Sequence, residues 1–306
     1  AVTSYTCGDL FLNSALLNAS INGMKNILEH SLYKDMLITI GAPHLHNNIL
    51  YNCAYMIFNG KILGIVPKSY IPNYSEFYEK RWFTEGVNVI DETTSLPFQD
   101  NIPFGTNLIF TAGEARFGVE VCEDLWVTIP PSSYLSIAGA NIIGNPSASN
   151  ELVSKKDYRL SLIENQSARC LGAYVYSSSG VHESTTDLLF SGHLIVAENG
   201  SIIKENERFQ RNNEVITTSI DLFKLNSERL KNLSFRDMNK LLPFNIKTID
   251  FCFKNTKITN FDRYVDKHPF VPSNPLARDE RCKEIFNIQC SALAKRLEHT
   301  NLKKAV

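Results

Sequence analysis

The stretch Phe117–Trp126, FGVEVCEDLW, is the part of this sequence on which the fold and its interpretation depend. Its first half alternates in hydrophobicity as a β-strand does. Phe117, Val119 and Val121 are expected on one face, and Gly118, Glu120 and Cys122 on the other. Cys122 therefore falls at the C-terminal end of a strand, which is where open α/β sheets present ligands.

The residues alone leave two interpretations of Cys122 open. It is either a small buried hydrophobic residue or a nucleophile. The acidic neighbours Glu120, Glu123 and Asp124 oppose ionisation of the thiol, so a reactive thiolate needs a cation close by. The spacing by itself favours the buried residue.

Composition places the chain among ordinary globular proteins. It has 306 residues, of which 43% are apolar and 21% charged, enough for one or two domains. The net charge of -1 gives no strong field toward nucleic acid or an anionic membrane. No apolar run reaches the roughly 18 residues that span a bilayer, and no signal peptide is recognised at the start. We expect a cytoplasmic protein that binds neither nucleic acid nor a membrane.

Cysteine and histidine usage points away from disulfides and metals. The seven cysteines are scattered, odd in number and without a CxxC pair, which is typical of a reduced chain. His44 and His46 form the only close histidine pair, and no cysteine or acid stands at ligand spacing beside them. We expect no metal site.

Strand and helix patterns alternate along the first 260 residues. Apolar residues at helical spacing predict a helix over 11–30, and a polar-rich helix is expected over 151–170. Asn59-Gly60 and Asn199-Gly200 each separate two apolar runs, which predicts two β-hairpins. Further strands are expected over 35–43, 106–112, 117–121, 139–149, 172–180 and 214–221. The pattern predicts mixed sheets covered by helical layers, an α/β or α+β fold.

The last 46 residues differ in character. FDRYVDKHPFVPSNPLARDERC (261–282) has the composition of a linker, and a helix is expected from about Leu276 to His299. This helix carries an apolar stripe of Phe286, Cys290, Leu293 and Leu297. The stripe needs a partner, which we expect beyond residue 306, and the closing NLKKAV is typical of the start of a buried strand. We therefore divide the chain into 1–260 and 261–306.

Lys68 directly follows the second strand of the first predicted hairpin, in GIVPKSYIPNYSEFYEKRWF (64–83). Aromatic and acidic residues surround it in sequence. Such a lysine is either held in one orientation as a point charge or solvated at the surface.

Two polar segments are also ambiguous. GNPSASNE (144–151) precedes a helix, so its serines and Asn150 either cap that helix or contact a ligand. SSSGVHESTTDLLFSGH (177–193) is either a turn-rich loop or a cradle for a small polar ligand. Neither segment has the glycine spacing of a phosphate-binding loop.

The order of these segments resembles the nitrilase superfamily, whose catalytic triad is Glu-Lys-Cys. More narrowly, the chain resembles the N-terminal glutaminase domain of glutamine-dependent NAD synthetases, nearly end to end. The matching segments are YTCGDLF (5–11), PKSYIPNYSEFYEKRWF (67–83), VEVCEDLW (119–126), NPSAS (145–149), ESTTDLLFSGH (183–193) and HPFVPSNP with DERCKEIFNIQCSALAKRLEH (268–299). The resemblance implies the four-layer α-β-β-α sandwich of carbon–nitrogen hydrolases.

The resemblance also implies roles for residues. Cys122 would be the nucleophile, Lys68 the triad lysine and Glu79 the supporting glutamate that holds the lysine. The residues that would line the glutamine pocket are Tyr5, Tyr74, Phe77, Glu123 and Ser149. The triad glutamate would lie two residues before Ala1, and an ATP-binding SGG-type loop would begin a few residues past Val306, so both are expected outside this sequence. Ser4 stands where the family usually has glycine.

The implied reaction is hydrolysis of the glutamine side-chain amide through a cysteine thioester, without a cofactor in this domain. Ammonia would pass to a synthetase domain that uses ATP, Mg and deamido-NAD, in a homo-oligomer. A free-standing amidase or carbamoylase of the same superfamily, and a non-catalytic scaffold domain on the same fold, remain alternatives.

Overall fold

The computed structural model describes residues 1–183, 187–254, 262–265, 267–268 and 270–304. It divides into two compact units, Ala1–Asp262 and Arg263–Val306. No helix among these described residues is both long and apolar enough to cross a membrane.

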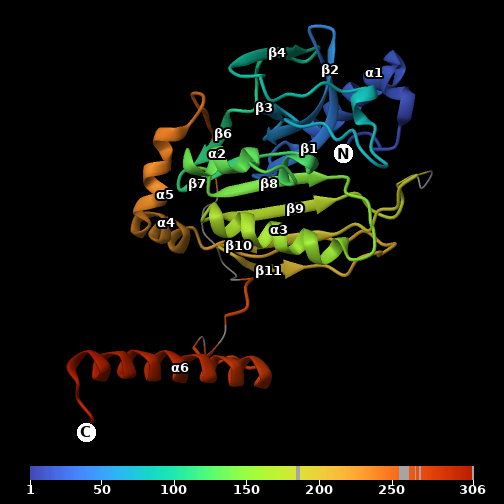
Figure 1. The fold of residues 1–306 in the computed structure, drawn as a ribbon. Helices are drawn as coiled ribbons and strands as arrows, with labels where there is room; N and C mark the ends of the chain where they lie inside the picture. Colours follow the sequence, from blue (N-terminus) through green and yellow to red (C-terminus); the bar gives the residue numbers. More distant parts are fainter. Residues whose placement is uncertain (184–186, 255–261, 266, 269, 305–306) are drawn as a thin grey trace. The chain divides into compact units, whose positions relative to one another are not determined.

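The first unit contains two mixed β-sheets (Figure 1). The strands of the first sheet are β1 (Leu37–His46), β2 (Ile49–Phe58), β3 (Lys61–Pro67), β5 (Gln99–Phe104) and β4 (Glu92–Leu96), in that spatial order. The β2–β3 turn is the predicted Asn59-Gly60 pair, both with positive φ, as the tight hairpin turn requires.

The second sheet has seven strands. In spatial order they are β11 (Ser201–Glu205), β10 (Leu194–Glu198), β9 (Ala173–Ser178), β8 (Ile142–Ser147), β7 (Ala115–Val119), β6 (Leu108–Ala112) and β12 (Lys247–Asp250). Strands β7, β8 and β9 are parallel neighbours, so their C-terminal ends meet at one edge. The turn between β10 and β11 is the second predicted hairpin, at Asn199-Gly200.

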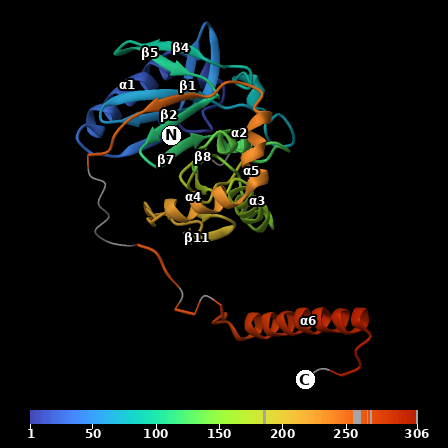
Figure 2. The ribbon, with the colours of Figure 1, turned by 90° about the vertical axis from the view of Figure 1, so that its left-hand side faces the viewer.

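The two sheets pack face to face between helical layers (Figures 1 and 2). Helix α1 (Ser14–Ser31) lies on β1 and β2, while α2 (Pro131–Ile137) packs on β7 and α3 (Lys155–Arg169) on β9, β10 and β11. The apolar core between the sheets consists of Ala54, Met56, Val66, Leu108, Phe110, Val119 and Val121. This arrangement confirms the predicted α-β-β-α layering.

The prediction of a strand at 214–221 is wrong. These residues are irregular, and Val215 is 85% exposed. No strand in the described part of the chain pairs with the segment, and Thr217 bonds elsewhere: its Oγ1 donates to Asp262 Oδ2 at 2.6 Å. Strand propensity needs a paired, half-buried surface to take effect. The sequence pattern also missed α2, β4, β5, β12, α4 (Leu222–Lys231) and α5 (Leu233–Asp237).

The second unit contains α6 (Pro275–Thr300), close to the predicted helix. Asn274 caps its N-terminus, because its Oδ1 accepts from Leu276 N at 2.9 Å. The apolar side chains Phe286 and Leu293 are 64% and 50% exposed. Residues 302–304 are irregular and exposed, without the predicted strand, and 305–306 lie outside the described residues. Part of the predicted linker, 261, 266 and 269, also lies outside them.

Candidate functional site

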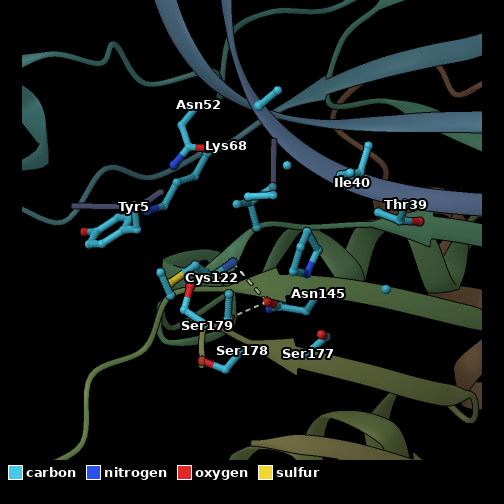
Figure 3. A pocket seen from close by; sticks show the side chains of 18 of the residues that line it. Tyr5, Thr39, Ile40, Asn52, Lys68, Cys122, Asn145, Ser177, Ser178 and Ser179 are labelled. Atoms are coloured by element: carbon cyan, nitrogen blue, oxygen red, sulfur yellow. Dashed lines mark hydrogen bonds between the residues drawn. The ribbon is translucent and has the colours of Figure 1, made fainter. Parts of the chain in front are cut away.

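A cavity of about 860 Å³ opens between the two sheets of the first unit. Figure 3 shows Asn52 and Lys68 reaching it from the first sheet and Cys122, Asn145 and Ser178 from the second. The N-terminal residues 1–5 complete its lining. Two of the predicted catalytic residues therefore meet in one cavity, although 54 positions separate them in sequence.

Cys122 enters the cavity because the backbone turns at this residue. Strand β7 ends at Val119, and Cys122 begins a short 3-10 helix, η3 (Cys122–Leu125), with a φ of 49°. A left-handed φ is strained for cysteine, by about 1 kcal/mol or more. The turn corrects one sequence expectation: Cys122 does not share a face with Glu120, whose carboxylate instead accepts from Ser132 N in α2.

Asp124 holds the cysteine turn and the lysine loop together. Its carboxylate accepts from Val121 N at 2.9 Å and from Tyr70 N at 2.9 Å. The side chain is buried, and this burial raises the pKa of Asp124 to about 7. In the sequence this acid stands beside the cysteine, but nothing there indicates its bridging role.

Lys68 is fixed as a buried cation. It is 1% exposed, and its Nζ lies 2.7 Å from Glu79 Oε2, which is equally buried. Burial opposes the lysine charge, but the Glu79 carboxylate and the nearby Cys122 outweigh it, so the pKa of Lys68 is raised. Asn52 completes the pair by donating to Glu79 Oε1 at 2.7 Å.

Tyr5 is the one predicted pocket residue that lines this cavity. Its hydroxyl donates to Glu79 Oε2 at 3.3 Å, and its backbone N–H donates to Glu183 Oε1 at 3.0 Å. Burial and the Glu79 charge raise the pKa of Tyr5, so the hydroxyl stays protonated. Residues 184–186 of the adjoining polar segment lie outside the described residues.

The four other predicted pocket residues lie outside the cavity lining. Tyr74 donates its hydroxyl to both oxygens of Glu123, at 2.9 and 3.1 Å, and its ring lies 5.9 Å from that of Phe77. Burial raises the pKa of Glu123. Ser149 is 3% exposed, and its Oγ has no hydrogen-bond partner within the described ranges.

Lys155 lies among the predicted pocket residues, outside the cavity lining, and the sequence did not single it out. Its Nζ lies 5.6 Å from the ring centre of Phe77 and 5.1 Å from that of Trp126, and it donates to Asn150 Oδ1. Its charge also acts on Glu123: burial raises the pKa of Glu123, and the Lys155 cation opposes that shift. No sequence signal distinguishes it from the next residue, Lys156, which pairs with Glu205 instead.

The described part of the chain holds no group of three or more His, Cys, Asp or Glu residues placed to bind a metal ion. The site contains a cysteine at a strained turn and a buried lysine. The lysine is held by Glu79, which also accepts hydrogen bonds from Asn52 and Tyr5. These suit nucleophilic attack on a carbonyl carbon with charge stabilisation of the oxyanion.

Comparisons with known proteins agree with this geometry. Glutamine-dependent NAD(+) synthetase from Mycobacterium tuberculosis is 35% identical over 312 residues, which cover all of this chain and 46% of that protein. The chain thus spans about half the length of the curated relatives it matches. No protein-family model matches the chain.

Solved structures show the same likeness. A glutamine-dependent NAD(+) synthetase from Cytophaga hutchinsonii has a TM-score of 0.59 and 30% identity, covering 67% of this chain and 33% of that one. A carbon–nitrogen hydrolase from Helicobacter pylori shares the fold at a TM-score of 0.59 and 18% identity, over 78% of this chain and 80% of that one. The chain is therefore a homologue of the glutamine-dependent NAD(+) synthetases and has the carbon–nitrogen hydrolase fold of the nitrilase superfamily.

Proposed function

We propose that the first unit hydrolyses the side-chain amide of glutamine and releases ammonia. The observation that carries the proposal is the pairing of Cys122, at a strained strand-end turn, with the buried Lys68–Glu79 ion pair in one cavity. A buried lysine supplies the cation that a thiolate among carboxylates requires. The relatives named above are glutamine-dependent, which supports glutamine as the nitrogen donor.

The proposed reaction proceeds through a thioester. Cys122 Sγ attacks the amide carbon, and the carbonyl π electrons move onto the oxygen. Lys68 stabilises this oxyanion, and so does the backbone N–H of Glu123, for which the described residues provide no hydrogen-bond acceptor. One such donor contributes about 3 kcal/mol to the transition state. The C–N bond then breaks, and the leaving NH₂ group takes up the proton that the cysteine thiol lost, which gives ammonia. Water then cleaves the thioester, which gives glutamate and restores the thiol.

A general base must move these protons. The family resemblance assigns that role to a glutamate that would precede Ala1. Residues 1–5 line the same cavity as Cys122, which supports a base supplied from this end of the chain. Glu79 holds Lys68 rather than serving as this base, because both of its oxygens already accept hydrogen bonds.

Recognition of glutamine is proposed to use one acidic and one basic side chain of the protein. Glu123, oriented by Tyr74, would pair with the α-ammonium, and the Lys155 cation would pair with the α-carboxylate. Tyr5, Phe77 and Ser149 would complete the pocket. The Ser149 hydroxyl is buried and has no partner in the described structure, so it is available to a ligand.

The wider role proposed is that of the glutaminase domain, residues 1–260, of a glutamine-dependent NAD synthetase. Residues 261–306 would lead into a synthetase domain that uses ATP and Mg, and α6 would contact it through its exposed apolar side chains. The relatives are about twice as long as this chain, as a second domain requires. We propose a cytoplasmic homo-oligomer whose glutaminase domain needs no cofactor.

Substrate choice tests this function. The full-length protein should release ammonia from glutamine far faster than from propionamide, a simple amide without α-groups. Glu123→Gln should lower kcat/KM for glutamine by about 10-fold or more and leave propionamide unchanged, because only glutamine carries an α-ammonium. Hydrolysis of propionamide but not glutamine would point to a free-standing type of amidase, and hydrolysis of neither to a scaffold domain.

A further inference from the structure

A buried chain of hydrogen bonds ends on the backbone of Cys122. Asn145 Oδ1 accepts from Cys122 N at 3.0 Å, and Asn145 Nδ2 donates to Tyr174 Oη at 2.8 Å. Tyr174 donates in turn to Glu120 Oε1, and Glu120 Oε2 accepts from Ser132 N at 2.7 Å. All four side chains are at most 2% exposed. Figure 3 shows Asn145 beside Cys122, with a dashed line for the hydrogen bond that joins them.

The direction of this chain determines the orientation of the Asn145 amide. The Tyr174 proton points to Glu120, so the Tyr174 oxygen can only accept from Asn145. The Asn145 NH₂ group must therefore face Tyr174, and its carbonyl oxygen must face Cys122 N and Ser147 Oγ, which also donates to it at 2.8 Å. Turning the amide over would place two donors against Cys122 N–H.

The burial of Glu120 explains the direction of these hydrogen bonds. The pKa of Glu120 is raised by burial, and hydrogen bonds from Tyr174 and Ser132 oppose that shift. Among the described residues, no lysine or arginine forms an ion pair with Glu120. A carboxylate buried without a cation is costly unless its hydrogen bonds are satisfied, and here Tyr174 and Ser132 N satisfy one oxygen each. Because the charge of Glu120 depends on these bonds, the Tyr174 proton is directed toward it.

We propose that Asn145 is a positioning residue, which Tyr174 and Glu120 orient so that it holds Cys122 in its left-handed turn. The proposal rests on the proposed function only in naming Cys122 as the nucleophile. With the N–H of Cys122 held, φ stays at 49° and the cysteine stays in the cavity that Lys68 also lines. Released, the cysteine would relax toward an ordinary backbone conformation, and its thiol would turn away from the cavity.

The test measures thiol reactivity, which does not depend on glutamine. Iodoacetamide is added to the full-length protein, and the Cys122 thiolate displaces iodide to form a thioether. Modification of the Cys122 peptide is followed by mass spectrometry against the exposed Cys252 of the same molecule. Asn145→Leu should slow Cys122 modification by about 10²-fold, the size of effect that a misplaced reacting group produces. The Cys252 rate should not change.

Asn141→Leu is the matched control. Asn141 is also a buried asparagine with both ends of its amide bonded: Nδ2 donates to Glu114 O and Oδ1 accepts from Arg116 N. It lies next to the opposite end of β8. In urea denaturation this variant should lose about as much free energy of unfolding as Asn145→Leu. Its rate of Cys122 modification should stay at the wild-type value. Equal slowing in both variants would overturn the proposal, because it would show general loosening.

A rescue experiment distinguishes positioning from packing. Asn145→Asp alone places Tyr174 between two carboxylates, at positions 120 and 145, and its single hydroxyl proton can be donated to only one of them. This variant should slow Cys122 modification. Adding Glu120→Gln reverses the direction of the hydrogen bonds. The amide introduced at position 120 donates to Tyr174, and Tyr174 donates to the carboxylate introduced at position 145. That carboxylate still accepts from Cys122 N. The double variant should recover to within about threefold of wild type. Failure to recover, in a variant as stable as Asn145→Asp, would contradict the proposal.

Glutamine hydrolysis then separates this proposal from the function. In Asn145→Leu, kcat should fall and KM should stay near the wild-type value, since Asn145 is not proposed to contact the substrate's α-groups. If wild type does not hydrolyse glutamine but the alkylation results hold, the proposed function fails and the positioning role stands. If wild type is active but Asn145→Leu is alkylated at the wild-type rate, the positioning role fails and the proposed function stands.

Discussion

At the scale of single residues, the site depends on one ion pair that is removed from water. Lys68 and Glu79 are each 1% exposed, and their charges lie 2.7 Å apart. Such a pair adds little net stability, but removal of one partner leaves the other charge buried and unpaired. The pair is therefore weak evidence for stability, and we propose that it serves the reaction at Cys122.

Glu79→Gln should lower the free energy of unfolding by about 3–5 kcal/mol, measured by urea denaturation, because Lys68 loses its counter-charge. Glutamine hydrolysis should also fall. Glu85→Gln is the control, since Glu85 pairs with Lys80 at the surface at 2.9 Å and should cost about 1 kcal/mol or less. Equal losses in the two variants would mean that Lys68 does not depend on Glu79.

At the scale of helices and strands, the sequence predicted local features well. The hairpins at Asn59-Gly60 and Asn199-Gly200 were predictable because their turns need positive φ, which these residues tolerate. The strand before Cys122 was predictable from its alternation. The turn that redirects Cys122 was not, because it is accompanied by hydrogen bonds to Asn145 and Asp124 that no periodicity reveals.

The site was predicted only in part for the same reason. Lys68 and Cys122 were identified by a resemblance over long motifs, whereas Lys155 has no motif and acquires its position from Phe77 and Trp126. The 214–221 segment shows the opposite error. Its strand-like pattern was clear, but no neighbouring strand in the described structure pairs with it.

A buried histidine in β1 predicts a pH effect on the first sheet. His44 is 2% exposed, and it hydrogen-bonds Tyr55 Oη in β2 and Thr94 Oγ1 in β4. Burial lowers the pKa of His44 from 6.5 to about 4. Between these values the unfolded chain binds a proton and the folded chain does not, so acidification favours unfolding.

The free energy of unfolding should therefore fall as the pH drops from about 6.5 to about 4, with a contribution from His44 on the order of 3 kcal/mol. Urea titrations across this range should show a flatter profile for His44→Gln than for wild type. His30→Gln, at an exposed position near the end of α1, should keep the wild-type slope. An unchanged slope in His44→Gln would contradict this origin of the acid sensitivity.

At the scale of the whole molecule, the chain corresponds to about half of its relatives. Helix α6 carries apolar side chains that are exposed in its own unit, and the proposed synthetase domain would cover them. Phe286→Ser should then reduce the NAD formed per ammonia released, because the two domains would be less well coupled. Glu284→Ser, a change at an exposed residue two positions away on the same helix, should not.

The two products are measured together on the full-length protein, with NAD and ammonia assayed in the same sample. A ratio that stays at the wild-type value in Phe286→Ser would show that α6 does not contact the synthetase domain through this side chain.

The proposed function depends above all on Cys122 being the nucleophile of a glutamine amidohydrolase. The decisive measurement is ammonia release from glutamine by the full-length protein, compared between wild type and Cys122→Ala. Cys53→Ala is the control, at a buried cysteine outside the cavity lining. We expect kcat to fall by more than about 10³-fold in Cys122→Ala and to stay near the wild-type value in Cys53→Ala. Ammonia released by Cys122→Ala at the wild-type rate would contradict the assignment.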